Sequence, residues 1–234
     1  MTTPSQAIRE KWRRADRQED REALVREELH RSPDDPALLH LAAVTYWGDA
    51  EGRPHEYLRQ ALARTDDPNL LTQCGHLLLD LGDLTAAIEA AKRARPALEE
   101  GFPLEAELLH LTGRLAAQRG DVESAKTLLE GLFAEEPQMS GLGYHLAHVH
   151  IQLQDAQRAR EVVTEALKHS QVRRLEDLRA ALEDANAMPP PEYRRVMGDL
   201  GEYRLKEEQS AGTGGKRQTI ELVEDLLKHL DLPE

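Results

Sequence analysis

The stretch from Leu111 to Pro137 reads LTGRLAAQRGDVESAKTLLEGLFAEEP and places small and turn-forming residues at fixed distances. Gly113 is followed after seven residues by Gly120, after twelve by Ala125 and after 24 by Pro137. The pair Gly120-Asp121 combines a glycine that ends a helix with an aspartate that caps the next one. The stretch therefore predicts two helices joined by a tight turn, with a small residue where their axes approach.

The same arrangement returns on both sides of this stretch. The second unit has Gly75, Gly82 and Ala87, the fourth has Ala147, Gln154 and Ala159, and the first retains Ala43. The leading small residues of successive units lie 32, 38 and 34 positions apart. This spacing predicts a row of helix pairs, each of which buries one face against the next.

A period of about 34 residues that carries two helices is typical of the tetratricopeptide repeat. Between about Pro36 and Ser170 the chain resembles that family. The resemblance implies an all-α fold, a right-handed superhelical array of antiparallel helix pairs, or α-solenoid. Apolar stripes after the fourth pair predict extra helices at the C-terminus. It also implies a protein-binding role in which a partner lies in the concave groove of the array.

The segments of the chain follow from this repeat and from its proline and glycine positions. Asp35-Pro36 and Asp67-Pro68 each open a helix, because a proline in the first turn loses no hydrogen bond. We expect N-terminal helices at 1–34 (a degenerate repeat or a cap), four repeats at 35–170, a capping helix at 171–188, an additional helix at 189–209, a flexible linker at 210–216 and a short amphipathic helix at 217–234.

The last helix stands outside the repeat register, and three interpretations of it remain open. It packs back on the array, it docks into a partner as a separate motif, or it occupies the chain's own groove and competes with a ligand. The short linker before it would give self-docking a high effective concentration. An alternative function follows from the second interpretation, namely a regulatory or assembly subunit that uses this helix.

Composition narrows the class of protein. The chain has 234 residues, a formal net charge of −13 and 4% aromatic residues. Such acidity excludes a nucleic-acid backbone as an obvious partner. No apolar run approaches the length of a membrane span, so we expect no membrane insertion and a cytoplasmic protein. The single cysteine, Cys74, excludes an internal disulfide and is expected in the core.

The resemblance also implies which side chains face a partner, because the first helix of each pair lines the groove in this family. The expected groove residues are His40, Val44, Trp47, Gln73, His76, Leu79, His110, Arg114, Tyr144, His145, His148 and Ile151. This mixture of apolar and histidine side chains suits a peptide or helix with aliphatic anchors. Trp12 and Trp47 are either stacking platforms for a ligand or residues that close a hydrophobic core.

Some family members grip acidic chaperone tails with a clamp of basic and asparagine side chains. The matching positions here hold His40, Val44, Gln73 and Leu111. Glu107 lies near a position where the clamp requires a basic side chain. We therefore expect no carboxylate clamp and no binding of chaperone tails. The expected partner is another protein that presents a peptide or a helix.

The histidines near the fourth small residue allow two further hypotheses. His145 and His148 lie one helical turn apart and could share a metal ion, or several imidazoles could sense pH together. His150 points away from both and is expected to face the interior of the array. No nucleophile with a base and no paired carboxylates share a face, so we expect no enzyme, no cofactor and no metal site.

Overall fold

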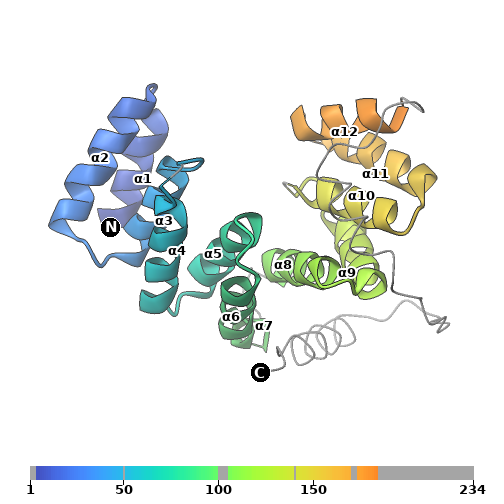
Figure 1. Cartoon of the computed structure of the whole chain (residues 1–234), viewed down its shortest axis with the longest axis horizontal. Coiled ribbons are helices and arrows are strands. Elements are labelled where there is room, and N and C mark those ends of the chain that lie inside the picture. Colours follow the sequence, from blue (N-terminus) through green and yellow to red (C-terminus); the bar gives the residue numbers. More distant parts are fainter. Residues whose placement is uncertain (1–3, 50, 100–104, 140, 170–172, 184–234) are drawn as a thin grey trace. The chain divides into compact units, whose positions relative to one another are not determined.

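The computed structural model describes residues 4–49, 51–99, 105–139, 141–169 and 173–183. Every regular element in these ranges is a helix, so the predicted all-α fold is confirmed (Figure 1). The chain divides into two compact units between Leu108 and Leu109. The predicted helices at 189–209 and 217–234, with the linker between them, lie outside the described residues.

Helices follow one another as antiparallel neighbours within each unit (Figure 1). The first unit contains α1 (Pro4–Arg14), α2 (Gln18–Arg31), α3 (Pro36–Thr45), α4 (Arg53–Arg64), α5 (Pro68–Asp80), α6 (Leu84–Ala94) and α7 (Pro96–Glu99). The helix α8 (Glu105–Gln118) begins in the first unit and continues into the second, which also contains α9 (Val122–Glu135), α10 (Leu142–Gln152), α11 (Ala156–His169) and α12 (Arg173–Glu183).

The Asp-Pro pairs begin helices as the sequence predicts. The Asp35 carboxylate accepts hydrogen bonds from the backbone N–H groups of Ala37 at 2.9 Å and Leu38 at 3.2 Å. The Asp67 carboxylate accepts one from Asn69 at 3.0 Å. These bonds satisfy donors that have no partner inside the helix, and the following proline fits the first turn of α3 and α5.

The turns inside three of the helix pairs share one backbone conformation. Gly82 and Gly120 have φ of 80° and 86°, in the left-handed region that glycine adopts without strain. Gln154 takes the same place in the pair α10–α11 with φ of 61°, although it carries a side chain. The aspartate that follows each of these residues then caps the next helix, with its carboxylate 2.9–3.3 Å from a backbone nitrogen.

The repeated small residues are buried in their helix pairs. Ala43 and Ala147 are fully buried, as are Ala87, Ala125 and Ala159 on the second helices. A Cβ atom on Gly113 would lie 2.5 Å from Cδ2 of Leu129, which is too close for any larger residue without movement. The predicted close approach is therefore confirmed at Gly113, and the alanines have the buried positions that it requires.

The two N-terminal helices pack on α3 through an apolar core of their own. Its buried residues are Val25, Leu38, Leu41, Ala42 and Tyr46, and Ile8, Trp12, Leu29 and Tyr57 pack against them. The indole Nε1–H of Trp12 donates a 2.9 Å hydrogen bond to Thr45 Oγ1, and the Arg21 guanidinium lies 4.8 Å from its ring centre. Trp12 therefore closes a core, which confirms one of the two interpretations considered for it.

Cys74 also has the core position that its sequence context predicts. Its side chain is fully buried in α5, and burial raises the pKa of its thiol to about 12. A thiol with such a pKa stays protonated at neutral pH and is a weak nucleophile.

The Asp83 carboxylate contacts α4 in addition to capping α6. Its carboxylate oxygen Oδ2 lies 2.6 Å from Nε2 of His55 and 2.8 Å from the guanidinium of Arg59, both on α4. The Asp83→Ala variant is expected to lower the free energy of unfolding by about 2 kcal/mol, because it removes a cap and these charged contacts. Urea unfolding of the full chain measures the loss.

Asp121 is the matched control for this substitution, because it occupies the same place in the pair α8–α9. Its carboxylate caps α9 through the backbone N–H of Ser124 at 3.3 Å. Asp121→Ala is expected to lower the free energy of unfolding by about 1 kcal/mol, the usual contribution of an N-cap. Equal losses in the two variants would show that the contacts of Asp83 with α4 contribute nothing.

Candidate functional site

The predicted groove residues of the first unit lie on α3, in the turn after it and on α5. His40 and Val44 are partly exposed on α3, and Trp47, two residues beyond its end, is 42% exposed. Their spacing of four residues puts His40 and Val44 on one side of α3, and Trp47 follows in the turn after this helix. Burial and the nearby Arg9 charge lower the pKa of His40 to about 4, so its imidazole is neutral at pH 7.

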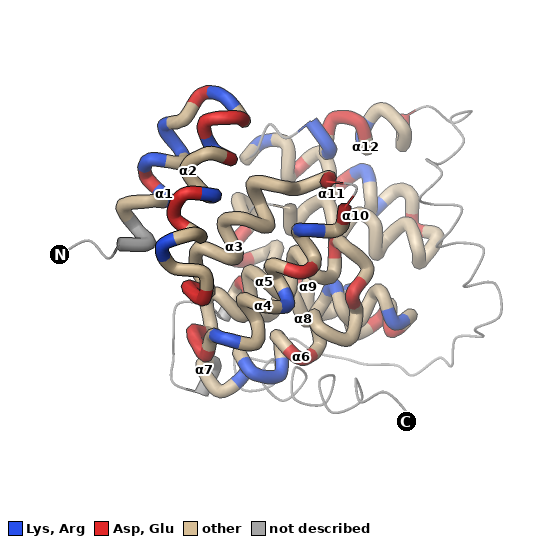
Figure 2. Tube along the Cα trace, turned by 60° about the vertical axis from the view of Figure 1, so that its left-hand side comes forward, with Lys and Arg blue, Asp and Glu red and all other residues tan. Residues whose placement is uncertain are grey.

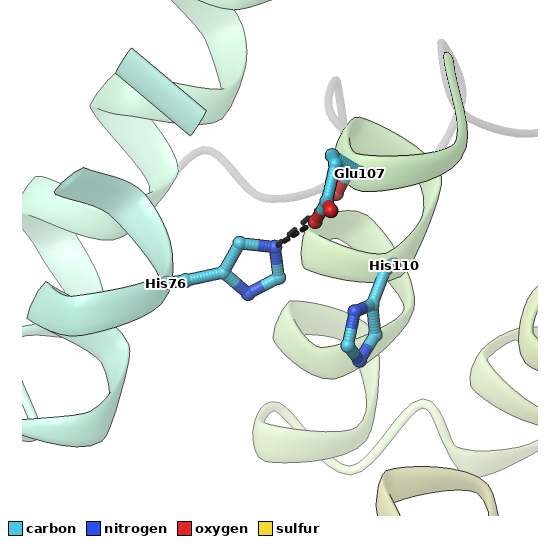
Figure 3. Close-up of side chains that lie close together, drawn as sticks. All are labelled: His76, Glu107 and His110. Atoms are coloured by element: carbon cyan, nitrogen blue, oxygen red, sulfur yellow. Dashed lines mark hydrogen bonds and ion pairs between the residues drawn. The ribbon is translucent and has the colours of Figure 1, made fainter. Parts of the chain in front are cut away.

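On α5 the predicted residues differ in their exposure. Gln73 is exposed and His76 is partly exposed, whereas Leu79 is buried with 8% of its surface accessible. The His76 ring nitrogen Nε2 donates to the backbone carbonyl of Glu107 at 3.2 Å, and it lies 3.7 Å from that residue's carboxylate. Figure 3 shows the ring pointing at Glu107, with His110 one turn further along α8.

The predicted residues of the second unit come from α8 and α10. Tyr144, His145, His148 and Ile151 are partly exposed on α10, and Arg114 is partly exposed on α8. His110 is buried, with 3% of its surface accessible.

His110 and His145 form the closest contact among these side chains. Nε2 of His110 lies 2.8 Å from Nδ1 of His145, and the ring centres are 4.9 Å apart. One ring donates its N–H and the other accepts, so the two are not protonated together while this bond is present. The sequence did not predict this pair, although both residues lie two or three positions before the small residue of their repeat.

Tyr144 and His148 form a second contact on α10. Their ring centres are 4.3 Å apart, and the Tyr144 ring also meets the edge of His145 at 5.6 Å. Burial lowers the pKa of His148 to about 4. His145 and His148, which the sequence placed together as candidate ligands of one metal ion, therefore make different contacts: His145 hydrogen-bonds His110, whereas His148 packs on Tyr144.

His150 lies apart from the other histidines, as predicted from its helical position. It is 1% exposed, and its Nε2 is 3.2 Å from the Glu130 carboxylate of α9. Arg158 of α11 approaches the same carboxylate oxygen at 3.6 Å. Burial lowers the pKa of His150 more than Glu130 raises it, so the buried ring is neutral at pH 7.

None of the described helices combines the length that a membrane crossing requires with a sufficiently apolar sequence.

Comparisons with known proteins agree on the fold. Residues 116–182 match the family model described as tetratricopeptide repeat. No curated protein sequence matches the chain.

Among solved structures, the chain is similar to the following three proteins. TTC0263, a thermophilic TPR protein of Thermus thermophilus, is 20% identical with a TM-score of 0.57, over 71% of this chain and 91% of that one. PilW, a type IV pilus biogenesis factor, is 16% identical with a TM-score of 0.62, over 86% of this chain and 91% of that one. Pseudomonas aeruginosa PilF is 17% identical with a TM-score of 0.55, over 85% of this chain and 91% of that one.

Identities this low establish a common fold and leave partners and roles open. The family match covers α9, α10 and α11 completely, with the end of α8 and most of α12, and includes the turn Gly120-Asp121. Residues 116–182 match the tetratricopeptide-repeat family, and the repeat spacing and the capped helix pairs agree with the fold that the chain shares with the solved tetratricopeptide-repeat protein TTC0263.

Proposed function

We propose that the chain is a protein-binding module that holds a peptide or helix of a partner against the first helices of its pairs. The observation that carries this proposal is the exposed indole of Trp47. Among the described residues, Trp47 and Leu81 are the large apolar side chains that are exposed, at 42% and 39%. Exposed tryptophan is frequent at the centre of binding surfaces, where it provides a large contact area.

The distribution of charge supports the same surface. The helices α3 and α10 contain no Lys, Arg, Asp or Glu, whereas α4 and α11 carry charges of both signs. Figure 2 shows α3 free of charged residues beside the strongly charged α1 and α2. An uncharged helix that presents partly exposed His40 and Val44 beside Trp47 suits a partner segment with apolar anchors.

The second unit offers polar and aromatic groups for the same purpose. Tyr144 presents a ring with a hydroxyl group, Ile151 presents an aliphatic side chain two turns away, and Arg114 adds a positive charge on α8. A partner segment with an acidic group near its apolar anchors would meet Arg114 favourably. We include these residues in the proposed binding surface of the second unit.

Trp47→Ala is expected to lower the capture of the partner from a native cell extract by at least about tenfold, because a buried tryptophan anchor is commonly worth about 2 kcal/mol or more. Full-length protein is immobilised, and the captured proteins are quantified by mass spectrometry. Leu81→Ala is the matched control, since Leu81 is similarly exposed but lies in the turn between α5 and α6. Equal capture by wild type and Trp47→Ala, with unchanged melting temperature, would overturn the proposal.

Two further variants assign the rest of the surface. Tyr144→Ala combined with His148→Ala tests the second unit, and a chain that ends at Glu208 tests the predicted last helix. Loss of the partner only with the double variant assigns recognition to α10. Loss only on truncation would move the binding function from the repeats to the last helix.

A further inference from the structure

We propose that His110 and His145 form a binding site for a late first-row divalent transition-metal ion, of which Ni²⁺ is the most convenient probe. The two residues belong to the second unit and come from neighbouring first helices, α8 and α10. This inference goes beyond protein binding, because it assigns an inorganic ligand to the chain.

The spacing of the two ring nitrogens fits a chelate. His110 Nε2 and His145 Nδ1 are 2.8 Å apart. Two nitrogens bound to one ion at about 2.0–2.1 Å lie roughly 2.9 Å apart at a right angle and roughly 3.4 Å apart in a tetrahedron. The distance between the two nitrogens therefore suits an ion in octahedral or square-planar geometry, which Ni²⁺ and Cu²⁺ adopt, once both rings have turned their lone pairs toward it.

The histidine pair can bind an ion without releasing a proton. In the hydrogen-bonded pair one neutral ring directs its N–H at the lone pair of the other. When an ion binds, the donating ring carries its proton on its other nitrogen, and both facing lone pairs become ligands. The rings must pivot so that both lone pairs converge on the ion, and the ring planes, inclined at 47°, already depart from a parallel arrangement.

The surroundings favour access for an ion from one side. His110 is 3% exposed, whereas His145 is partly exposed. Water is a suitable further ligand for such an ion.

His148 is left out of the donor set on geometric grounds. It follows His145 by one turn, but its ring packs against Tyr144 with centres 4.3 Å apart. The proposed site therefore differs from a site formed by His145 and His148, since its second histidine comes from another helix.

Isothermal titration of the full-length, untagged chain with NiCl₂ at pH 7.5 tests the proposal. We expect one ion per chain, and we expect His145→Asn to weaken binding by at least about tenfold because it removes one of two imidazole ligands. His110→Asn should have the same effect.

The matched control is His169→Asn, which removes an exposed histidine of the same unit. Wild-type affinity in this control excludes general binding by surface histidines. A second measurement is the melting temperature, which Ni²⁺ should raise in wild type but not in His145→Asn. Absence of binding to wild type, or wild-type affinity in a folded His145→Asn variant, would overturn the proposal. Because His145 is partly exposed, this variant remains informative even if His110→Asn fails to fold.

Discussion

Gly143→Val is expected to lower the free energy of unfolding of the full chain by about 3 kcal/mol. A Cβ atom on Gly143 would lie 2.4 Å from Cβ of Ala166 on α11 and 3.3 Å from the Phe133 ring on α9. The Ala166 Cβ is fixed by the backbone and cannot rotate away, so α10 and α11 must move apart. Urea unfolding followed by circular dichroism measures the effect.

Gly131→Ala is the control for this substitution. Gly131 lies inside α9, and a Cβ atom there would meet nothing within 4 Å. The free energy of unfolding of this variant is expected to be higher by about 0.5–1 kcal/mol, since alanine loses less conformational entropy than glycine when a helix forms. A Gly143→Val variant as stable as wild type would show that α10 and α11 do not approach each other as closely as the structure has them.

Stability is expected to fall when the pH decreases from 7 to 5, by about 2 kcal/mol for each of His40 and His148. The pKa of each is lowered to about 4 in the folded chain, by burial in both cases and by Arg9 in the case of His40. In the unfolded chain a histidine has a pKa of about 6.5. Burial of His150 shifts its pKa in the same direction and adds to the loss.

The sign follows from the number of protons bound in each state. Between the folded and the unfolded pKa values the unfolded chain binds more protons, so acid favours unfolding. The stabilisation is fully present above the unfolded pKa of about 6.5 and decreases as the pH falls toward 4. The two histidines lie in different units, so each unit has its own acid-sensitive group.

Urea unfolding of wild type, His40→Asn and His148→Asn at pH 7 and pH 5 tests this prediction. Each variant should lose less stability on acidification than wild type, by about 2 kcal/mol. His30→Asn, which changes an exposed histidine of α2, should retain the wild-type pH dependence. The same loss in wild type and in both variants would contradict the assignment of acid sensitivity to these two residues.

The helix pairs were predictable because their determinants are local. Asp35 and Asp67 cap helices that begin at the next residue, and the backbone of Gly82 and Gly120 takes the left-handed conformation that the turn requires. Such interactions connect residues two to four positions apart, which a single sequence displays directly. The period of about 34 residues then identified the repeat.

The contacts between helices were harder to predict, because helical periodicity gives the face of a side chain but not its opposite neighbour. Ala147 was expected to mark the closest approach in the fourth pair, yet Gly143, one turn earlier, meets Ala166. His145 and His148 were considered together because they share one helix. The structure instead pairs His145 with His110, which lies 35 positions earlier in the chain.

The sequence by itself determined the class of fold, the order of the helix pairs and the small residues between them, because these depend on caps, turns and spacing along one chain. Only the tertiary structure decided that Trp12 closes a core while Trp47 is exposed, and that two histidines from different helices lie within hydrogen-bonding distance. These outcomes depend on which side chains meet across neighbouring helices, and packing in three dimensions selects them from many arrangements that the same periodicity allows.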